Sequence, residues 1–343
     1  MREWNTRQSS QPPRKPDYRI TLPDRTISRE LEARLISLTL TDRRGTESDQ
    51  VDIILSDHDG RLEIPPRGAE LHVAIGWSDT GLVDRGTYIV DEVEHSGPPD
   101  QLTIRGRAAD MQHSLPGRRS QSWDNVTVGE ILESIAGRHS LGTATNQDLM
   151  QRTIEHIDQT DESDMHFLTR LGERFDAVAT IKAGRLLFVP ASEGQTASGT
   201  PIPPITLTRS DGDQHTFTIA ERNQYSGVIT YWQDYEEGTR DLVLVGSDEN
   251  PLRKRETFES RESARTAAEA EWQRVQRAGD RISLTLHSGR PEIHPETPFR
   301  VSGWKTDIEE VPWVIAEIVH SIDGSRFTSS LQLEPLNLED LNT

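Results

Sequence analysis

The residues with the greatest capacity for chemistry in this sequence are carboxylates and histidines, but their spacing supports no site. Asp57-His-Asp59-Gly60 resembles the start of a calcium-binding loop. The later ligands, and the bidentate carboxylate that completes such a loop, are missing from the residues that follow. The pairs His156/His166 and His287/His294 do not have a metal-binding spacing. We therefore interpret the Asp57 segment as a turn and predict no metal site.

Catalytic and cofactor motifs are missing from the sequence as well. It has no glycine-rich phosphate loop, no G-x-S-x-G nucleophile elbow and no H-E-x-x-H helix. It also has no cysteine, which excludes disulfides, thiolate metal ligands and cysteine nucleophiles. We predict no catalytic residues and no cofactor.

One segment occurs twice. Tyr88-Ile-Val-Asp-Glu-Val-Glu-His-Ser96 is matched in residue class by Trp313-Val-Ile-Ala-Glu-Ile-Val-His-Ser321, and a Gly-Trp pair precedes each copy. Such agreement predicts one β-unit that is built twice in the chain. The matched positions are Tyr88 with Trp313, Glu92 with Glu317, and His95 with His320.

Glu92 and Glu317 lie in the middle of these strands, among β-branched neighbours. The structural interpretation is an outward-facing position on an alternating strand. The functional interpretation is a position at an assembly surface or a channel surface. The sequence leaves both open.

The composition narrows the possible partners. Of the 343 residues, 33% are hydrophobic and 28% are charged, and the net charge is -19. So acidic a surface repels nucleic-acid phosphates unless a local basic patch overrides it. No run approaches the roughly 20 apolar residues of a membrane helix, and no signal-peptide core is visible. We expect synthesis in the cytoplasm and no membrane segment.

The pattern of elements predicts a mainly β fold with an α+β insert. Two similar antiparallel β-barrels flank a small α/β domain. Capping residues mark helix starts at Thr127 and Ser260. The expected divisions are a flexible N-terminal arm over 1–16, a first β-barrel domain over 17–118, an inserted α/β domain over 119–192, a linker over 193–204, a second β-barrel domain over 205–336 and a C-terminal tail over 337–343.

Three segments, in this order, carry a family resemblance: Pro65–Trp77, Ile157–Leu171 and Lys182–Pro190. The second contains the most specific motif, an E-S-D-x-x-F-L-x-R-L helix start. Its residues are Glu162, Ser163, Asp164, Phe167, Leu168, Arg170 and Leu171. The chain resembles the late control D proteins of contractile phage tails. These are baseplate hub proteins related to the T-even hub and to the N-terminal part of type VI secretion spike proteins.

The resemblance implies a homotrimeric structural hub that joins a hexameric tail tube to a central spike and encloses the channel, without catalysis. The implied partners are the tail tube, central spike, tape-measure and baseplate wedge proteins, with DNA only in transit. The implied location is the virion tail baseplate, assembled in the host cytoplasm. Two similar barrels per chain would present six similar units to a six-fold tube, which removes the symmetry mismatch.

Other functions remain open on the sequence alone. The chain could be a hub-like domain of a non-contractile tail or of an injection machine. It could also be a tail module that binds or hydrolyses polysaccharide. For the hub we further expect the insert at the periphery and an excess of Asp and Glu over Arg on the channel-facing strands.

Overall fold

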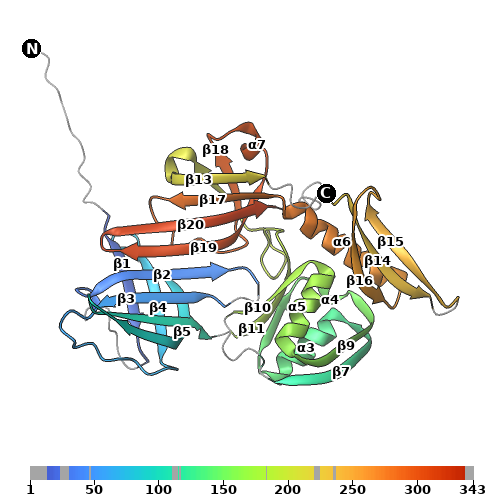
Figure 1. Ribbon diagram of the computed structural model, residues 1–343, viewed down its shortest axis with the longest axis horizontal. Helices are drawn as coiled ribbons and strands as arrows, with labels where there is room; N and C mark the ends of the chain where they lie inside the picture. The colour runs from blue at the N-terminus through green and yellow to red at the C-terminus, as the bar shows by residue number, and fades with distance from the viewer. Residues whose placement is uncertain are drawn as a thin grey trace, which may run out of the picture.

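The computed structural model describes residues 14–23, 31–45, 48–109, 115, 117–182, 184–219, 225–234 and 237–336. The expected tail over 337–343, and all but the last three residues of the expected arm, lie outside these ranges. The predicted mainly β fold, with an α/β insert between two similar β-units, is confirmed. Figure 1 shows the two units stacked on one side of the molecule and the helical parts on the other.

The first unit has six strands in the spatial order β1-β4-β5-β6-β3-β2. Alternate side chains of these strands point into one hydrophobic core, which includes Leu40, Val51, Val73 and Tyr88. The strands are β1 (Pro16–Thr21), β2 (Leu35–Arg43), β3 (Gln50–Ser56), β4 (Glu70–Trp77), β5 (Gly81–Ser96) and β6 (Gln101–Ala108).

The second unit has six strands in the order β12-β18-β19-β20-β17-β13. Its core includes Leu284, Phe299, Trp313 and Ile318, with the short helix α7 (Thr306–Glu309) at its edge. The strands are β12 (Ile205–Thr208), β13 (Gly212–Ile219), β17 (Asp280–Leu286), β18 (Pro298–Ser302), β19 (Trp313–Asp323) and β20 (Arg326–Pro335).

The two units agree strand by strand. Numbered along the chain within each unit, both follow the order 1-4-5-6-3-2. Both carry a β-bulge in the fifth strand, at Asp91 and at Ala316. Both carry another in the second strand, at Ile36 and at Asp213. One difference is that β12 pairs with β18 in parallel, whereas β1 pairs with β4 antiparallel.

A strand ladder joins the two units into one 12-stranded sheet. β2 of the first unit pairs antiparallel with β19 of the second. Side chains seal the joint: the Trp77 ring packs 5.2 Å from that of Phe327, and its Nε1 donates to the Gly289 carbonyl at 2.9 Å. The buried Arg85 donates to the Pro291 carbonyl at 2.9 Å and pairs with Asp42. The units are therefore joined by a backbone ladder and by buried side-chain contacts.

The insert lies between the units in sequence and has its own core. Helices α3 and α5 pack against it through Ile131, Leu132, Phe167 and Leu171, all fully buried. A sheet of β10, β11 and β8 and a ribbon of β7 and β9 complete it. Its elements are β7 (Arg118–Thr127), α3 (Val128–Arg138), β8 (Gly142–Thr145), α4 (Gln147–Met150), β9 (Thr153–Ser163), α5 (Asp164–Phe175), β10 (Ala177–Lys182) and β11 (Arg185–Pro190).

Residues 227–277 differ from the expectation of one continuous second barrel over 205–336. They form a second insertion between β13 and β17, with a separate sheet in the order β15-β14-β16. Helix α6 covers one face of this sheet, and Phe258, Ala264 and Ala267 form a small core of their own. The elements are β14 (Gly227–Asp234), β15 (Thr239–Gly246), β16 (Pro251–Phe258) and α6 (Arg261–Arg277).

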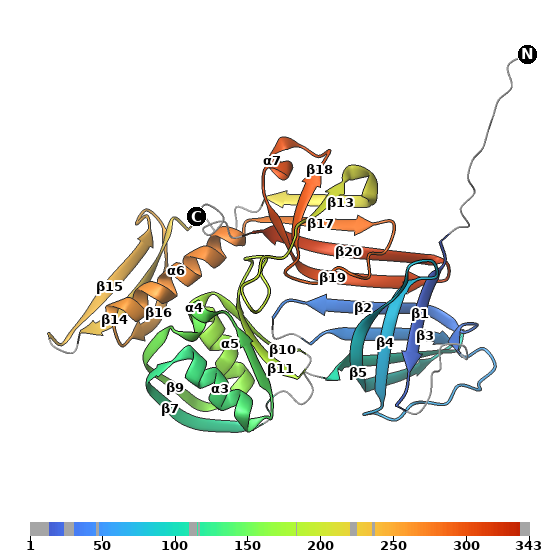
Figure 2. The same ribbon diagram turned by 180° about the vertical axis from the view of Figure 1, so that it is seen from behind.

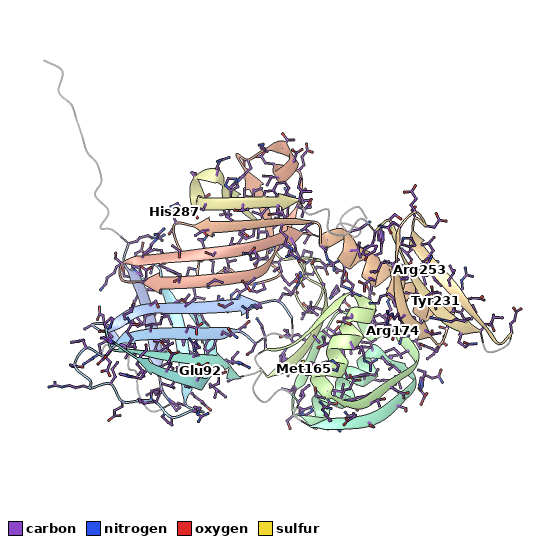
Figure 3. All side chains as sticks on the ribbon, in the orientation of Figure 1. Glu92, Met165, Arg174, Tyr231, Arg253 and His287 are labelled. Carbon is purple, nitrogen blue, oxygen red and sulfur yellow. The ribbon has the colours of Figure 1, made fainter. Side chains whose placement is uncertain are left out.

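The second insertion packs on the insert rather than on the second unit, as both views show (Figures 1 and 2). Arg174 of α5 pairs with Glu259 at 2.5 Å, and both guanidinium Nη atoms of Arg277 reach the Asp176 carboxylate at 2.6 Å. Figure 3 shows Arg174 where the two parts meet. They form one lobe beside the 12-stranded sheet.

Candidate functional site

Eight consecutive strands of the large sheet, β5-β6-β3-β2-β19-β20-β17-β13, share one face that the two cores do not use. We call it the open face. Its residues are cross-strand partners from one ladder to the next, for example Asp52 with Arg105 and Thr39 with Ser321. They are partly or fully exposed, apart from Thr41 and, at one end of the face, Ile89 and Val314. The open face is therefore the largest sheet surface available to a partner in the described part of the chain.

Charges on the open face nearly balance. In the described strands it carries slightly more carboxylates than arginines, and it has no lysine, although the chain as a whole carries -19. The carboxylates are Asp52, Asp91, Glu92, Glu94, Glu317 and Asp323, and the arginines are Arg43, Arg105, Arg107, Arg281 and Arg326.

Hydroxyl side chains dominate the rest of the open face. Some bond to each other or to amides across strands: Ser283 donates to Gln332 Oε1 at 2.7 Å, and Thr285 and Ser330 lie 3.2 Å apart. The hydroxyl residues are Ser37, Thr39, Thr41, Ser56, Ser96, Thr103, Thr216, Thr218, Ser283, Thr285, Ser321, Thr328 and Ser330.

Arg105 is held by three carboxylates. Its Nη1 lies 2.6 Å from Glu92 and 3.6 Å from Glu94, and its Nε lies 3.5 Å from Asp52. Partial burial raises the pKa of Asp52, and the Arg105 charge opposes that rise. Opposite charges on facing strands stabilise a sheet modestly. The Glu92 contact is a hydrogen bond, and the other two carboxylates act on the guanidinium mainly through their charge.

Glu317 has the same place in the second unit that Glu92 has in the first, one residue after the bulge of the fifth strand. Its carboxylate meets Arg43 of β2 at 2.7 Å, across the joint between the units. Both duplicated glutamates therefore face outward on the open face, and each pairs with an arginine of an adjacent strand.

The other duplicated residues lie in different surroundings. Tyr88 and Trp313 are both core residues, and Trp313 Nε1 donates to the Ile308 carbonyl at 2.9 Å. His320 is buried beside β2 and shares a hydrogen bond with Ser329 Oγ at 2.8 Å, and burial lowers its pKa well below the ordinary value. His95 is largely exposed and reaches Asp57 at 3.3 Å.

Two of the open strand edges correspond to the two strands that form the joint between the units. β4 pairs with β5 only as far as Ile89, so the following half of β5 has no partner on that edge among the described residues. In the second unit the equivalent edge of β19 is closed by β2. β13 is the terminal strand of the sheet and pairs, within the described chain, with β17 alone.

A buried charge cluster ties the units to the insert, and the sequence analysis did not find it. Arg44, which follows β2, donates to Ser192 Oγ at 2.7 Å and lies 3.3 Å from Glu296; it also pairs with Glu334. Burial raises the pKa of Glu296 to about 7, opposed by Arg44 and reinforced by Glu334. No spacing in the sequence signals this cluster, because its members come from four separate segments.

Glu296 occupies a backbone position that glycine fills in the first unit. The Gly68 N–H donates to the Val90 carbonyl at 2.7 Å, and the Glu296 N–H donates to Ile315, the residue equivalent to Val90, at 2.9 Å. Both residues have left-handed backbone angles, with φ 87 and φ 66. A non-glycine residue is strained there. The Glu296 carboxylate contacts Arg44 and Ser192, which explains why the second unit has a glutamate instead of a glycine at this position.

The residues of the E-S-D motif cap helix α5 and hold it in place in the insert. Ser163 caps α5 by accepting from the His166 N–H at 3.2 Å, and Glu162 pairs with Arg170 at 2.5 Å. Asp164 is buried, and the structure surrounds its carboxylate with Arg119, Arg138, His139 and Gln159. Burial acts to raise the pKa of Asp164, but the bonds from Gln159 and His139 and the arginine charges outweigh it, so the pKa is lowered. Phe167, Leu168 and Leu171 fill the core.

The Asp57 segment forms a turn. Asp57 Oδ1 accepts from the Leu62 N–H at 3.0 Å, and Asp59 pairs with Arg34 at 2.6 Å. No group of three or more His, Asp or Glu in the described residues could hold a metal ion. No helix in that part of the chain is long and apolar enough to span a membrane.

Comparisons with known proteins agree on one kind of molecule. The family model described as "Phage tail baseplate hub (GPD)" matches residues 38–325. The chain is 40% identical over 360 residues to a "Probable baseplate hub protein" of Escherichia phage 186, covering 93% of this chain and 92% of that protein.

Among solved structures, a tail protein from Neisseria meningitidis MC58 is similar in fold, with a TM-score of 0.69 at 13% identity over 93% of this chain and 96% of that one. The Escherichia coli c3393 protein has a TM-score of 0.54 at 13% identity over 89% of this chain and 74% of that one. It is described as a type VI secretion component that resembles the T4 tail proteins gp27 and gp5.

Proposed function

The chain belongs to the phage tail baseplate hub family, and from this premise we propose that three copies form a ring that joins the hexameric tail tube to the central spike and encloses the channel. As a baseplate hub it is a structural component of the phage tail. The ring, its partners and its channel are the parts that this proposal adds.

The observation that carries the proposal is the joint between the two units. Inside the chain, the second strand of the first unit pairs with the fifth strand of the second. The second strand of the second unit, β13, and the fifth strand of the first, β5, have the open edges. If β13 of one copy pairs with β5 of the next, every unit is joined to its neighbour in the same way. Such a head-to-tail contact closes into a ring if the rotation fits, and three copies give six similar units.

The in-chain joint also fixes the register. Thr39 of β2 pairs with Ser321 of β19. Counted from the shared bulges, Thr216 of β13 is equivalent to Thr39, and Ser96 of β5 is equivalent to Ser321. The joint between copies would therefore pair Thr216 of one copy with Ser96 of the next.

The same register accounts for an exposed apolar side chain. Ile219, at the end of β13, is 68% exposed. Its equivalent is Asp42, which pairs with Ile318 in the in-chain joint, and the equivalent of Ile318 is Val93. Ile219 would thus be covered by Val93 of the next copy.

The proposed ring also predicts where each of the remaining partners would bind. The two cores lie on the other side of the sheet from the open face, so the open face would line the channel through which the tape-measure protein and DNA pass. The tail tube and the spike would occupy the two ends of the ring. The lobe of insert and second insertion would point outward, where it could meet wedge proteins. This role requires no catalysis.

A cysteine cross-link tests the ring directly, because the natural chain has no cysteine. Ser96→Cys combined with Thr216→Cys should oxidise to a covalent trimer, since paired strand residues lie within disulfide range. The control is Ser96→Cys with Ser283→Cys, because Ser283 lies one strand further in. Both variants should have the trimer mass in solution. Monomers in solution, or equal cross-linking of the control, would refute the ring.

A further inference from the structure

The open face carries only slightly more carboxylates than arginines, although the chain as a whole carries -19. Its arginines therefore decide whether a passing polyanion binds. Unpaired arginines on such a surface would bind phosphates, because a guanidinium matches phosphate in charge and geometry. What matters is therefore whether these arginines are free.

The arginines at the middle of the face are occupied. Arg105 is engaged on Nη1 by Glu92 and Glu94 and on Nε by Asp52. Arg43 donates through Nε to Glu317 at 2.7 Å, and these two side chains are only 31% exposed. In each case the carboxylate comes from an adjacent strand, which keeps the guanidinium close to the sheet.

The surroundings of these pairs are uncharged. Hydroxyls and amides form most of the face, and some of them are already bonded to one another. The face has no lysine in the described strands, and hence no mobile ammonium group to seek a phosphate. Because these hydroxyls and amides are uncharged and keep their hydrogen bonds to one another, they would bind DNA that moves along the face only weakly.

We propose that the open face is a shielded lining for duplex DNA, in which Asp52, Glu92, Glu94 and Glu317 act as positioning residues that hold Arg105 and Arg43 away from phosphates. The inference rests on the proposed function, because it takes the open face as the channel wall. It assigns a role to the duplicated glutamates: Glu92 neutralises Arg105 within the first unit, and Glu317 neutralises Arg43 across the joint between the units.

The test uses the purified full-length protein and a fluorescent duplex of about 20 base pairs, a length chosen to match roughly the site sizes of DNA-binding modules. Asp52→Asn, Glu92→Gln and Glu94→Gln together free Arg105 without changing side-chain size. The matched control, Asp241→Asn, Glu249→Gln and Glu262→Gln, makes the same change in net charge on exposed residues of the second insertion. Thermal unfolding confirms that each variant is folded.

We expect the natural protein and the control to leave the duplex free at low salt, and the triple variant to bind at least tenfold more tightly than the control. Three freed arginines per ring should give a log–log salt slope of about -3. Adding Arg105→Gln to the triple variant should abolish the binding. If the triple variant does not fold, Glu92→Gln alone, which removes the hydrogen bond to Arg105, provides the same comparison with Glu249→Gln as its control.

Binding by the natural protein, or equal binding by the triple variant and its control, would overturn the proposal. Failure of the ring gives a different result: the cross-link and the solution mass report it whether or not DNA binds. A ring that forms, with a triple variant that ignores DNA, would refute the shielded lining alone.

Discussion

The fifth strands of the two six-stranded units have the same bulge and the same neighbours on one side, but differ on the other. The edge of β19 is covered by β2, whereas the corresponding edge of β5 is open. His320 is consequently 1% exposed, and the side chain of its equivalent, His95, is 43% exposed. The residue type and the local strand are the same, so the difference comes entirely from the adjacent strand. The burial of a side chain in this molecule therefore depends on the joint between the units as well as on the unit that contains the residue.

The largest test of this comparison replaces each histidine with lysine. His320→Lys places a charge in the sealed joint near Arg85, and should lower the free energy of unfolding by about 4 kcal/mol or more. His95→Lys should change it by about 0.5 kcal/mol or less in the dissociated chain. Urea denaturation of both variants measures the difference. Similar losses in the two would mean that the edges are equivalent.

The free energy of unfolding should depend on pH through Glu296 but not through its counterpart Gly68, because only Glu296 has an ionisable side chain. The Glu296 carboxyl has a pKa of about 7 in the folded chain against 4.5 as its ordinary value. The folded state therefore holds an extra proton between these values. The contribution of the Glu296 carboxyl to the free energy of unfolding is therefore greatest below pH 4.5. It falls by up to about 3 kcal/mol as the pH rises through 7.

Glu296→Gln keeps the size of the side chain and removes the titration. The free energy of unfolding of this variant, relative to the natural protein, should rise between pH 5 and pH 8 by up to about 3 kcal/mol. Denaturant titrations at the two pH values provide the measurement, and Glu334→Gln serves as the neighbouring control. A constant difference between variant and natural protein would show that Glu296 is ionised throughout.

The equivalent aromatic residues Tyr88 and Trp313 extend the comparison to the cores of the two units. Trp313 uses its N–H in a bond to Ile308, whereas the buried Tyr88 hydroxyl has no partner among the described residues. Trp313→Phe should cost about 2 to 3 kcal/mol through a cavity and a lost bond. Tyr88→Phe should cost nothing or stabilise by up to about 1 kcal/mol. Thermal unfolding distinguishes them, and a costly Tyr88→Phe would reveal a partner for its hydroxyl.

The smallest effects are expected at the duplicated glutamates. Glu317→Gln should cost about 1 kcal/mol, because its pair with Arg43 is only 31% exposed. Glu92→Gln should cost about 0.5 kcal/mol or less, since the Glu92 side chain is 59% exposed. Raising the salt concentration should shrink both differences. A larger loss at Glu92 in the dissociated chain would reverse the comparison.

Much of the local structure could be predicted from the sequence. The caps at Thr127 and Ser260 are present, because capping depends on residues three apart. The fold class followed from alternation and from the repeated segment. The separate sheet of β14, β15 and β16 could not be predicted, because alternation indicates a strand but not its partner.

The bulges and the charge cluster were hidden for the same physical reason. The residues at equivalent bulges, Asp91 and Ala316, have nothing in common in type, since a bulge is a backbone feature. Arg44 and Glu296 meet only after the units have joined. The Ser163 and Asp164 motif was visible, but its function in packing required the coordinates.

The ladder between β2 and β19 also changes how a ring of six units could come together. Because one joint in two is made while the chain folds, closure becomes an encounter of three bodies instead of six. The tethered halves meet at an effective concentration on the order of millimolar, far above that of free chains in a cell. More than half of the translational entropy that joining six separate units would cost is thus lost within the single chains, and dilution can break a ring only into whole chains.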